Sequence, residues 1–191
     1  MNILFFRHGE TPWNQEKRFQ GHTDIALSKK GISEVSNWHM PENIQHWFVS
    51  PLLRAQQTAE IHKLNPITIS EEIIEASWGQ WEGKILKQLR KIHPGEIAEM
   101  ESLGLDMRPP GGESPRDVRS RLSGWLESLP TDYERIGVVT HRGVIRAALS
   151  KATHWDMKSA HAVDVTHNKA YEFSWVDSQL LYIAQHDLIK R

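Results

Sequence analysis

Ile3-Leu4-Phe5-Phe6-Arg7-His8-Gly9-Glu10-Thr11 places a histidine beside an arginine directly after a short apolar run. Four consecutive apolar residues before a polar loop predict a buried strand from Ile3 to Phe6. A neutral imidazole can attack phosphorus, and an adjacent guanidinium can bind phosphoryl oxygens as charge develops on them. The pair Arg7 and His8 therefore suits phosphate chemistry, although an isolated histidine after a strand can also be an ordinary loop residue.

Two other short strands are followed by the same kinds of residue. The apolar run 47–49 precedes a segment that contains Arg54, and the run 136–139 precedes one that contains His141. A further strand is expected at 67–69, and the alternation of strands with helical patterns predicts an α/β fold with a mostly parallel sheet. Ligands bind beyond the carboxyl ends of such strands, so we expect His8, Arg54 and His141 to meet there.

Helix and turn signals complete the predicted order of elements. Ser114 is a good N-cap with Pro115 at the first helical position, and the apolar stripe that follows is expected to pack in the core. A second helix is expected over 55–62, starting close after Arg54. The tail predicts a hairpin of 171–176 and 179–184 at the sheet edge.

Composition favours one soluble domain that acts on a small molecule. The chain has 191 residues, a formal net charge of -1 and no cysteine. Residues 1–191 are therefore expected to form a single domain without disulfides or thiolate metal sites. The balanced charge gives no footprint for nucleic acid, and no segment is long and apolar enough for a membrane. We expect a cytoplasmic location, and the oligomeric state is not indicated.

The ordered set of motifs resembles the histidine phosphatase superfamily, also called the phosphoglycerate mutase-like family. The resemblance spans roughly residues 2 to 146. Besides the segments above, it rests on Asn14, on the run Arg18-Phe19-Gln20-Gly21-His22-Thr23-Asp24 and on the loop Glu75-Ala76-Ser77-Trp78-Gly79-Gln80-Trp81-Glu82-Gly83. It implies a three-layer α/β/α sandwich with a mostly parallel central sheet.

The resemblance also implies a role for each matching residue. His8 matches the nucleophile that forms a phosphohistidine, Arg7 and Arg54 match the phosphate clamp, and His141 matches the histidine that donates to a phosphoryl oxygen. Glu75 matches the general acid. The remaining residues expected to contact the phosphate are Asn14, Gln20 and Gly21, and Glu82 is expected to support the clamp. Neither a metal nor another cofactor is expected, because the basic side chains supply the charge.

Several readings of the function stay open. The segment 84–114 is a candidate lid, and its shortness together with the Pro110 to Ser114 run favours a phosphomonoesterase over a cofactor-dependent phosphoglycerate mutase. The pattern is similar to that of α-ribazole phosphatases and broad-specificity phosphatases, and Trp13, Trp78 and Trp81 could stack on a substrate ring. A regulatory module that only binds phosphate is an alternative, as is a metal site at His154, His161 and His167.

Arg142 and Ala26 depart from the family pattern. A glycine or another small residue usually follows the second histidine, whereas this chain has Arg142; a proline is common where Ala26 stands. An added cation at the pocket edge could recruit a second anionic group of the substrate. It could instead point to solvent and pair with a carboxylate, and the sequence does not choose between these alternatives.

Overall fold

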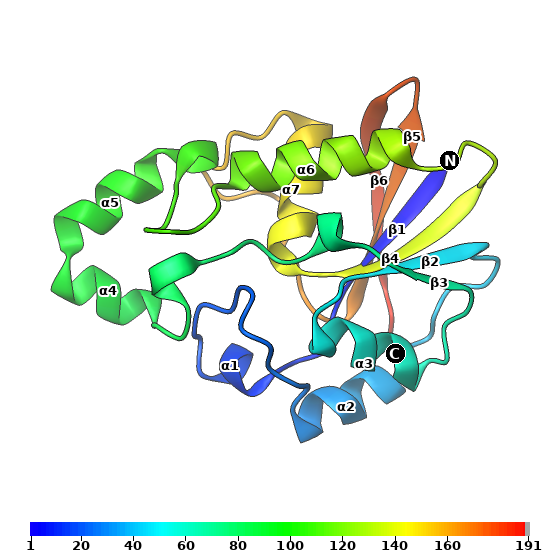
Figure 1. Ribbon diagram of the computed structural model, residues 1–191, viewed down its shortest axis with the longest axis horizontal. Coiled ribbons are helices and arrows are strands. Elements are labelled where there is room, and N and C mark those ends of the chain that lie inside the picture. Colours follow the sequence, from blue (N-terminus) through cyan, green and yellow to red (C-terminus); the bar gives the residue numbers. More distant parts are fainter. Residues whose placement is uncertain (190–191) are drawn as a thin grey trace.

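A single sheet organises the computed structural model, which describes residues 1–189 (Figure 1). The strands follow the order β3-β2-β4-β1-β5-β6, with β1 to β4 parallel, β5 antiparallel to β1 and β6 antiparallel to β5. The prediction of a mostly parallel sheet is confirmed. The strands are β1 (Asn2–Arg7), β2 (His46–Val49), β3 (Ile67–Ile69), β4 (Arg135–Thr140), β5 (Lys169–Val176) and β6 (Gln179–Asp187).

Helices cover both faces of the sheet, as the alternation of side chains along β1 requires. Ile3 and Phe5 pack into the core beneath α6 and α7, whereas Leu4 and Phe6 pack into the core beneath α2 and α3. Figure 1 shows these helix pairs on opposite sides of the strands, which confirms the three-layer α/β/α sandwich. The helices are α1 (Pro12–Gln15), α2 (Lys29–Ser36), α3 (Leu53–Ile61), α4 (Leu86–Ile92), α5 (Pro94–Ser102), α6 (Pro115–Ser128) and α7 (Arg142–Thr153).

The structure confirms that Ser114 caps α6, as predicted from the sequence. It also shows that α3 begins earlier than predicted. Ser114 accepts from the backbone of Asp117, whose side chain in turn accepts from the Ser114 N–H, so α6 begins with a capping box. The expected helix over 55–62 begins earlier, at Leu53, which places Arg54 in its first turn. The reason is a cap from outside the segment, because the Leu53 N–H donates to Oδ1 of Asp24 at 2.8 Å.

The predicted hairpin at the sheet edge is confirmed and is longer than expected. Asp177 and Ser178 both have positive φ, 49° and 59°, which is the backbone of a type I′ turn. β5 pairs with β1 on one side and β6 on the other, so β6 forms the edge.

The expected lid segment 84–114 forms α4, α5 and a short 3-10 turn (Gly104–Asp106), which project to the left of the sheet in Figure 1. Leu89 and Ile97 pack on Trp81 to form a small core of their own. This projecting helical pair therefore packs apart from the two main cores. Within residues 1–189, no helix has the length and apolar content to span a membrane.

Candidate active site

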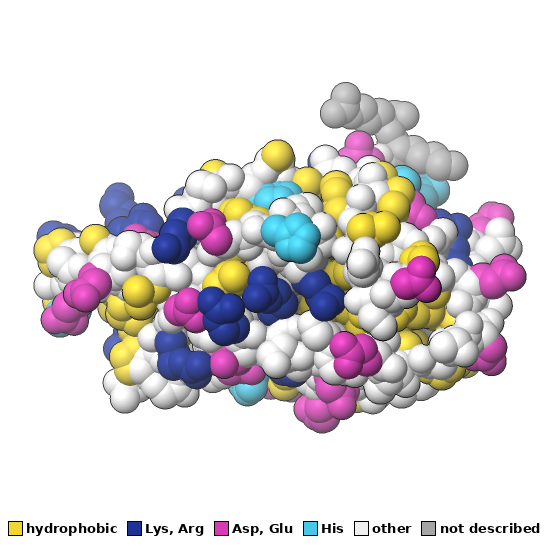
Figure 2. Space-filling view, turned by 90° about the horizontal axis from the view of Figure 1, so that it is seen from above, with side chains coloured by type: hydrophobic (Ala, Val, Ile, Leu, Met, Phe, Trp, Pro, Cys, Tyr) yellow, Lys and Arg dark blue, Asp and Glu magenta, His cyan; other side chains and the backbone are white. Residues whose placement is uncertain are grey.

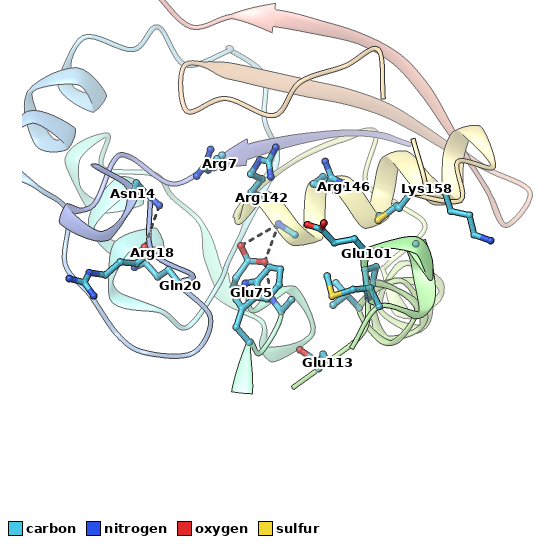
Figure 3. A pocket seen from close by; sticks show the side chains of 18 of the residues that line it. Arg7, Asn14, Arg18, Gln20, Glu75, Glu101, Glu113, Arg142, Arg146 and Lys158 are labelled. Carbon is cyan, nitrogen blue, oxygen red and sulfur yellow. Dashed lines mark hydrogen bonds between the residues drawn. The ribbon is translucent and has the colours of Figure 1, made fainter. Parts of the chain in front are cut away.

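A cavity of about 540 Å³ lies beyond the carboxyl ends of β1 and β4 (Figure 3). Parallel strands direct their carboxyl ends to one edge, and the loops that follow supply the wall. The projecting helical pair contributes Arg90 and Glu101 to it. The residues expected from the sequence that lie on the wall are Arg7, His8, Asn14, Gln20, Glu75 and Arg142. Gly21, Arg54 and His141 are buried behind these residues and do not line the cavity.

His8 lies directly after β1, and its side chain is buried at the cavity wall. Its Nδ1 lies 2.7 Å from the carbonyl oxygen of Gly9. Since a carbonyl oxygen only accepts, Nδ1 carries the proton and donates it. Nε2 is therefore unprotonated and has a free lone pair. Burial, together with the nearby His141 and Arg54, holds the pKa of His8 well below 6.5. The imidazole is therefore neutral and nucleophilic at neutral pH.

Arg7 and Arg54 bring guanidinium groups toward His8 from two different elements. Arg7 ends β1 and donates to the carbonyl of Val165 at 3.2 Å. Burial and the neighbouring Arg142 lower the pKa of Arg7 to about 10, so the group keeps its charge at neutral pH. Arg54 is wholly buried and donates to the carbonyl of Gly21 at 2.8 Å. The buried Nε atoms of both arginines lack a partner within the described residues.

Gly21 and Glu82 act on Arg54 through the loop that holds it. Arg54 donates to the carbonyls of Gly21 and Thr23, and Glu82 accepts from the backbone N–H groups of His22 and Thr23, each at 2.8 Å. Burial alone would raise the pKa of Glu82, but hydrogen bonds from Thr23 and His22 outweigh it and lower that pKa. Glu82 thus supports the loop around the guanidinium, and the site places Gly21 as an acceptor for Arg54.

His141 follows β4 and stands next to His8, with ring centroids 5.1 Å apart. Its Nε2 lies 2.6 Å from Oγ of Ser50, and its Nδ1 has no partner within residues 1–189. Burial and the nearby Arg54 hold the pKa of His141 well below 6.5. The two imidazoles are therefore both neutral, which removes the repulsion that two charged rings would have at this distance.

Glu75 is fixed by the start of α7. Its Oε1 accepts from the N–H of Ala76 at 2.8 Å and from that of Gly143 at 3.0 Å. A Cβ on Gly143 would overlap Oε1 of Glu75, so a larger residue at this position would push the carboxylate out of place. The carboxylate is buried yet reaches the cavity wall, where it can exchange a proton with a bound group.

Asn14 and Gln20 are held by the turn that follows His8. Asn14 completes a capping box with Thr11, whose hydroxyl donates to Oε1 of Gln20 at 2.7 Å. Nε2 of Gln20 is buried on the cavity wall and lacks a partner among residues 1–189. Its amide is therefore an unused hydrogen-bond donor at the site.

His167 lies against His8, and the sequence analysis grouped it with a different kind of site. Its Nδ1 donates to the carbonyl oxygen of His8 at 2.6 Å, with ring centroids 5.7 Å apart. Burial, with a contribution from Arg7, lowers the pKa of His167 to about 4. Over the described part of the chain no three metal-ligating side chains gather, so His154, His161 and His167 do not form a cluster.

Arg142 both faces the cavity and pairs with a carboxylate, and its contact with a second anionic group of the substrate stays a prediction. It is the first residue of α7, lines the cavity and lies 3.6 Å from Oδ1 of Asp164, a carboxylate that is itself 79% exposed. Two further cations on the wall, Arg146 and Lys158, were not singled out from the sequence, because only the fold brings them to the cavity.

The sequence matches the Histidine phosphatase superfamily (branch 1) over residues 3–182. It is 33% identical over 162 residues to Phosphoglycerate mutase-like protein 4 of Arabidopsis thaliana, covering 78% of this chain and 70% of that protein. It is 29% identical over 162 residues to the uncharacterized phosphatase PhoE of Bacillus subtilis, covering 81% of this chain and 78% of that protein. The alpha-ribazole phosphatase from Shigella flexneri superposes with a TM-score of 0.84 over 99% of this chain and 98% of that one, at 21% identity, a likeness that shows the shared fold.

Proposed function

The chain belongs to the histidine phosphatase superfamily, branch 1, and from that premise we propose that it is a phosphomonoesterase acting through a phosphohistidine on a small phosphorylated metabolite. The neutral imidazole of His8 on the cavity wall carries the proposal. Its Nδ1 proton is engaged by Gly9, so Nε2 is free to attack. Arg7 beside it and the unused amide of Gln20 supply donors for the phosphoryl oxygens.

In the proposed reaction, Nε2 of His8 forms a bond to phosphorus as the bond to the ester oxygen breaks in line with it. The leaving oxygen takes a proton from the carboxyl group of Glu75, and the alcohol departs. Water then attacks the phosphohistidine and gives its proton to Glu75, which releases phosphate and restores both groups. Arg7, Arg54 and the ring of His141 surround His8, so we propose that they balance the phosphoryl charge and that no metal is needed.

Hydrolysis is proposed over mutase activity because the segment 84–114 supplies a short cover, and a mutase must shield its phosphohistidine from water. The relatives carry both kinds of name, so transfer to a second phosphoglycerate is the competing outcome. α-Ribazole phosphate is the finer candidate substrate, suggested by the structural neighbour and by Trp78 on the wall. Trp81 is buried in the small core and cannot stack on a ligand.

Rapid quench with a labelled substrate tests the nucleophile. The wild type should accumulate an acid-labile, base-stable phosphoryl group that His8→Ala lacks, and His8→Ala should have no phosphatase activity. Label on serine or aspartate, or full activity of the variant, would overturn the assignment. Chasing the labelled enzyme with 3-phosphoglycerate distinguishes the two reactions, because a mutase returns the label to phosphoglycerate whereas a phosphatase releases it as phosphate.

The leaving group tests the acid. Glu75→Gln should lower turnover of alkyl phosphates by about 10²- to 10⁴-fold and affect p-nitrophenyl phosphate much less, since nitrophenolate leaves without a proton. Glu113→Gln is the matched control, because Glu113 also lines the cavity but pairs with Arg121 at 3.1 Å. Equal losses on both substrates would exclude Glu75 as the acid.

A further inference from the structure

A second group of cations lines the cavity away from the carboxyl end of β1. Arg142 and Arg146 stand one turn apart on α7, so their side chains share one face of the helix. Lys158 lines the cavity from the loop beyond α7, but its ammonium group points away from the two arginines (Figure 3). A cavity of about 540 Å³ is the size that holds a whole small ligand. It therefore has room for more than the phosphoryl group beside His8.

These three cations lack strong partners in the protein. Among residues 1–189, Arg146 makes no ion pair or side-chain hydrogen bond, and its guanidinium lies 4.6 Å from the ring centre of Trp155. Burial lowers the pKa of Arg146 to about 10, so it stays charged at neutral pH. In that part of the chain Nζ of Lys158 has no carboxylate oxygen within 4.0 Å, although its backbone N–H donates to Oδ1 of Asp156 at 3.0 Å. Nη2 of Arg142 has only the exposed Asp164, with Oδ1 at 3.6 Å.

The other cations at the edge of the cavity are already neutralised. Arg18 pairs with Glu16, and Arg90 pairs with Glu101 at 2.5 Å. The positive charge left over beyond Arg7 is therefore concentrated on the α7 side. Figure 2 shows several Lys and Arg side chains near the middle of one face of the molecule, with Asp and Glu side chains beside them.

We propose that Arg142 and Arg146 form a second anion subsite, which binds a carboxylate or phosphate at the far end of the substrate. The proposal rests on the proposed phosphomonoesterase function and narrows its substrate class to phosphate esters with a second anionic group. A partly buried guanidinium without a counter-ion is costly, and a planar anion would satisfy two of its donors at once. α-Ribazole phosphate, which has no such second group, becomes the less favoured substrate.

The kinetic test compares 3-phosphoglycerate with glycerol 3-phosphate, which differ at the end remote from the phosphate. The wild type should prefer the carboxylate in kcat/KM. Arg146→Gln should reduce this preference by about 10- to 100-fold, the effect of one charge-assisted hydrogen bond. Arg142→Gln should reduce it by up to about fivefold, because an exposed charge is screened by solvent. Arg18→Gln, which removes a cation of the same wall whose partner Glu16 lies outside the cavity lining, should leave the preference unchanged.

Binding separates this proposal from the proposed hydrolysis. Calorimetry on the purified protein compares methylphosphonate with phosphonoacetate, phosphonopropionate and phosphonobutyrate, none of which is a phosphate ester. At least one of the carboxylates should bind about 10- to 100-fold more tightly than methylphosphonate, and Arg146→Gln and Arg142→Gln should reduce that gain. Arg142 is exposed, so its variant tests the subsite even if Arg146→Gln lowers the melting temperature.

Equal affinity for all four phosphonates, or a carboxylate preference that survives in both arginine variants, would overturn the subsite. A protein that binds the carboxylates tightly but hydrolyses no ester would instead overturn the proposed function and leave the subsite standing. If wild type and variants all hydrolysed 3-phosphoglycerate and glycerol 3-phosphate at equal rates, the subsite would be overturned and the proposed phosphatase function would stand.

Discussion

His167 makes the stability of the fold depend on pH in a calculable way. In the folded chain burial, with a contribution from Arg7, lowers the pKa of His167 from 6.5 to about 4, whereas the unfolded chain keeps the ordinary value. Between these values the unfolded state binds more protons, so the free energy of unfolding falls as the pH falls. Each tenfold difference in proton affinity corresponds to about 1.4 kcal/mol. His167 alone should therefore remove about 2 kcal/mol of stability between pH 7 and pH 4.5.

Urea unfolding of the wild type and His167→Asn at both pH values isolates this contribution. Asparagine cannot titrate, and its amide can still donate to the carbonyl of His8, so the variant should lose about 2 kcal/mol less than the wild type on acidification. The pKa values of His8 and His141 are also lowered by burial, so these residues add to the loss of stability at low pH. They do so equally in the wild type and in His167→Asn, and their contribution cancels in the comparison. His39→Asn, at an exposed position, serves as the control and should follow the wild type. Parallel profiles for the wild type and His167→Asn would refute the reasoning.

Three further results are expected. Thr58→Val should destabilise the fold by about 1 to 3 kcal/mol in urea because the N–H of Gly9 loses its buried acceptor, whereas Thr58→Ser keeps the hydroxyl and should be milder. Gly137→Ala should cost about 1 to 3 kcal/mol since its Cβ would overlap the ring of Trp47, and Trp47→Leu should recover part of the loss in the double variant. Phosphatase activity should survive EDTA and be inhibited by vanadate, because cationic side chains balance the phosphoryl charge; complete loss on chelation, restored by one divalent ion, would contradict the proposed chemistry.

Local patterns were enough to predict an α/β fold with a mostly parallel sheet, and the resemblance to a family added the three layers. A strand that is buried on both faces, such as Ile3 to Phe6, appears in the sequence as a continuous apolar run. The cap of α6 could also be recognised locally, because Ser114 and Asp117 lie within one turn of each other. The resemblance to a family then selected His8 and Glu75, which the fold brings to one wall although 67 positions separate them in the printed sequence.

Contacts between distant segments were beyond the reach of these patterns. α3 starts two residues earlier than expected because Asp24, from another loop, caps it. His167 contacts His8 across a separation of 159 residues, and no local signal distinguishes it from the other histidines. Arg146 lies in a helical pattern that would look the same at any half-buried position. The sequence therefore did not indicate that Arg146 faces the cavity, which depends on how α7 packs.

The pairing of β1 with β4 has a consequence for the order in which this molecule becomes active. Arg7 pairs with Thr140, and the N–H of His8 donates to the carbonyl of Thr140 at 2.9 Å, so the sheet itself sets the spacing of His8 and His141. A slip of one residue would turn the two rings to opposite faces. Closing a loop of this length is slow compared with forming local helices. We therefore expect the histidine pair to assemble after the local helices, and return of activity during refolding would mark the moment at which the two central strands find their register.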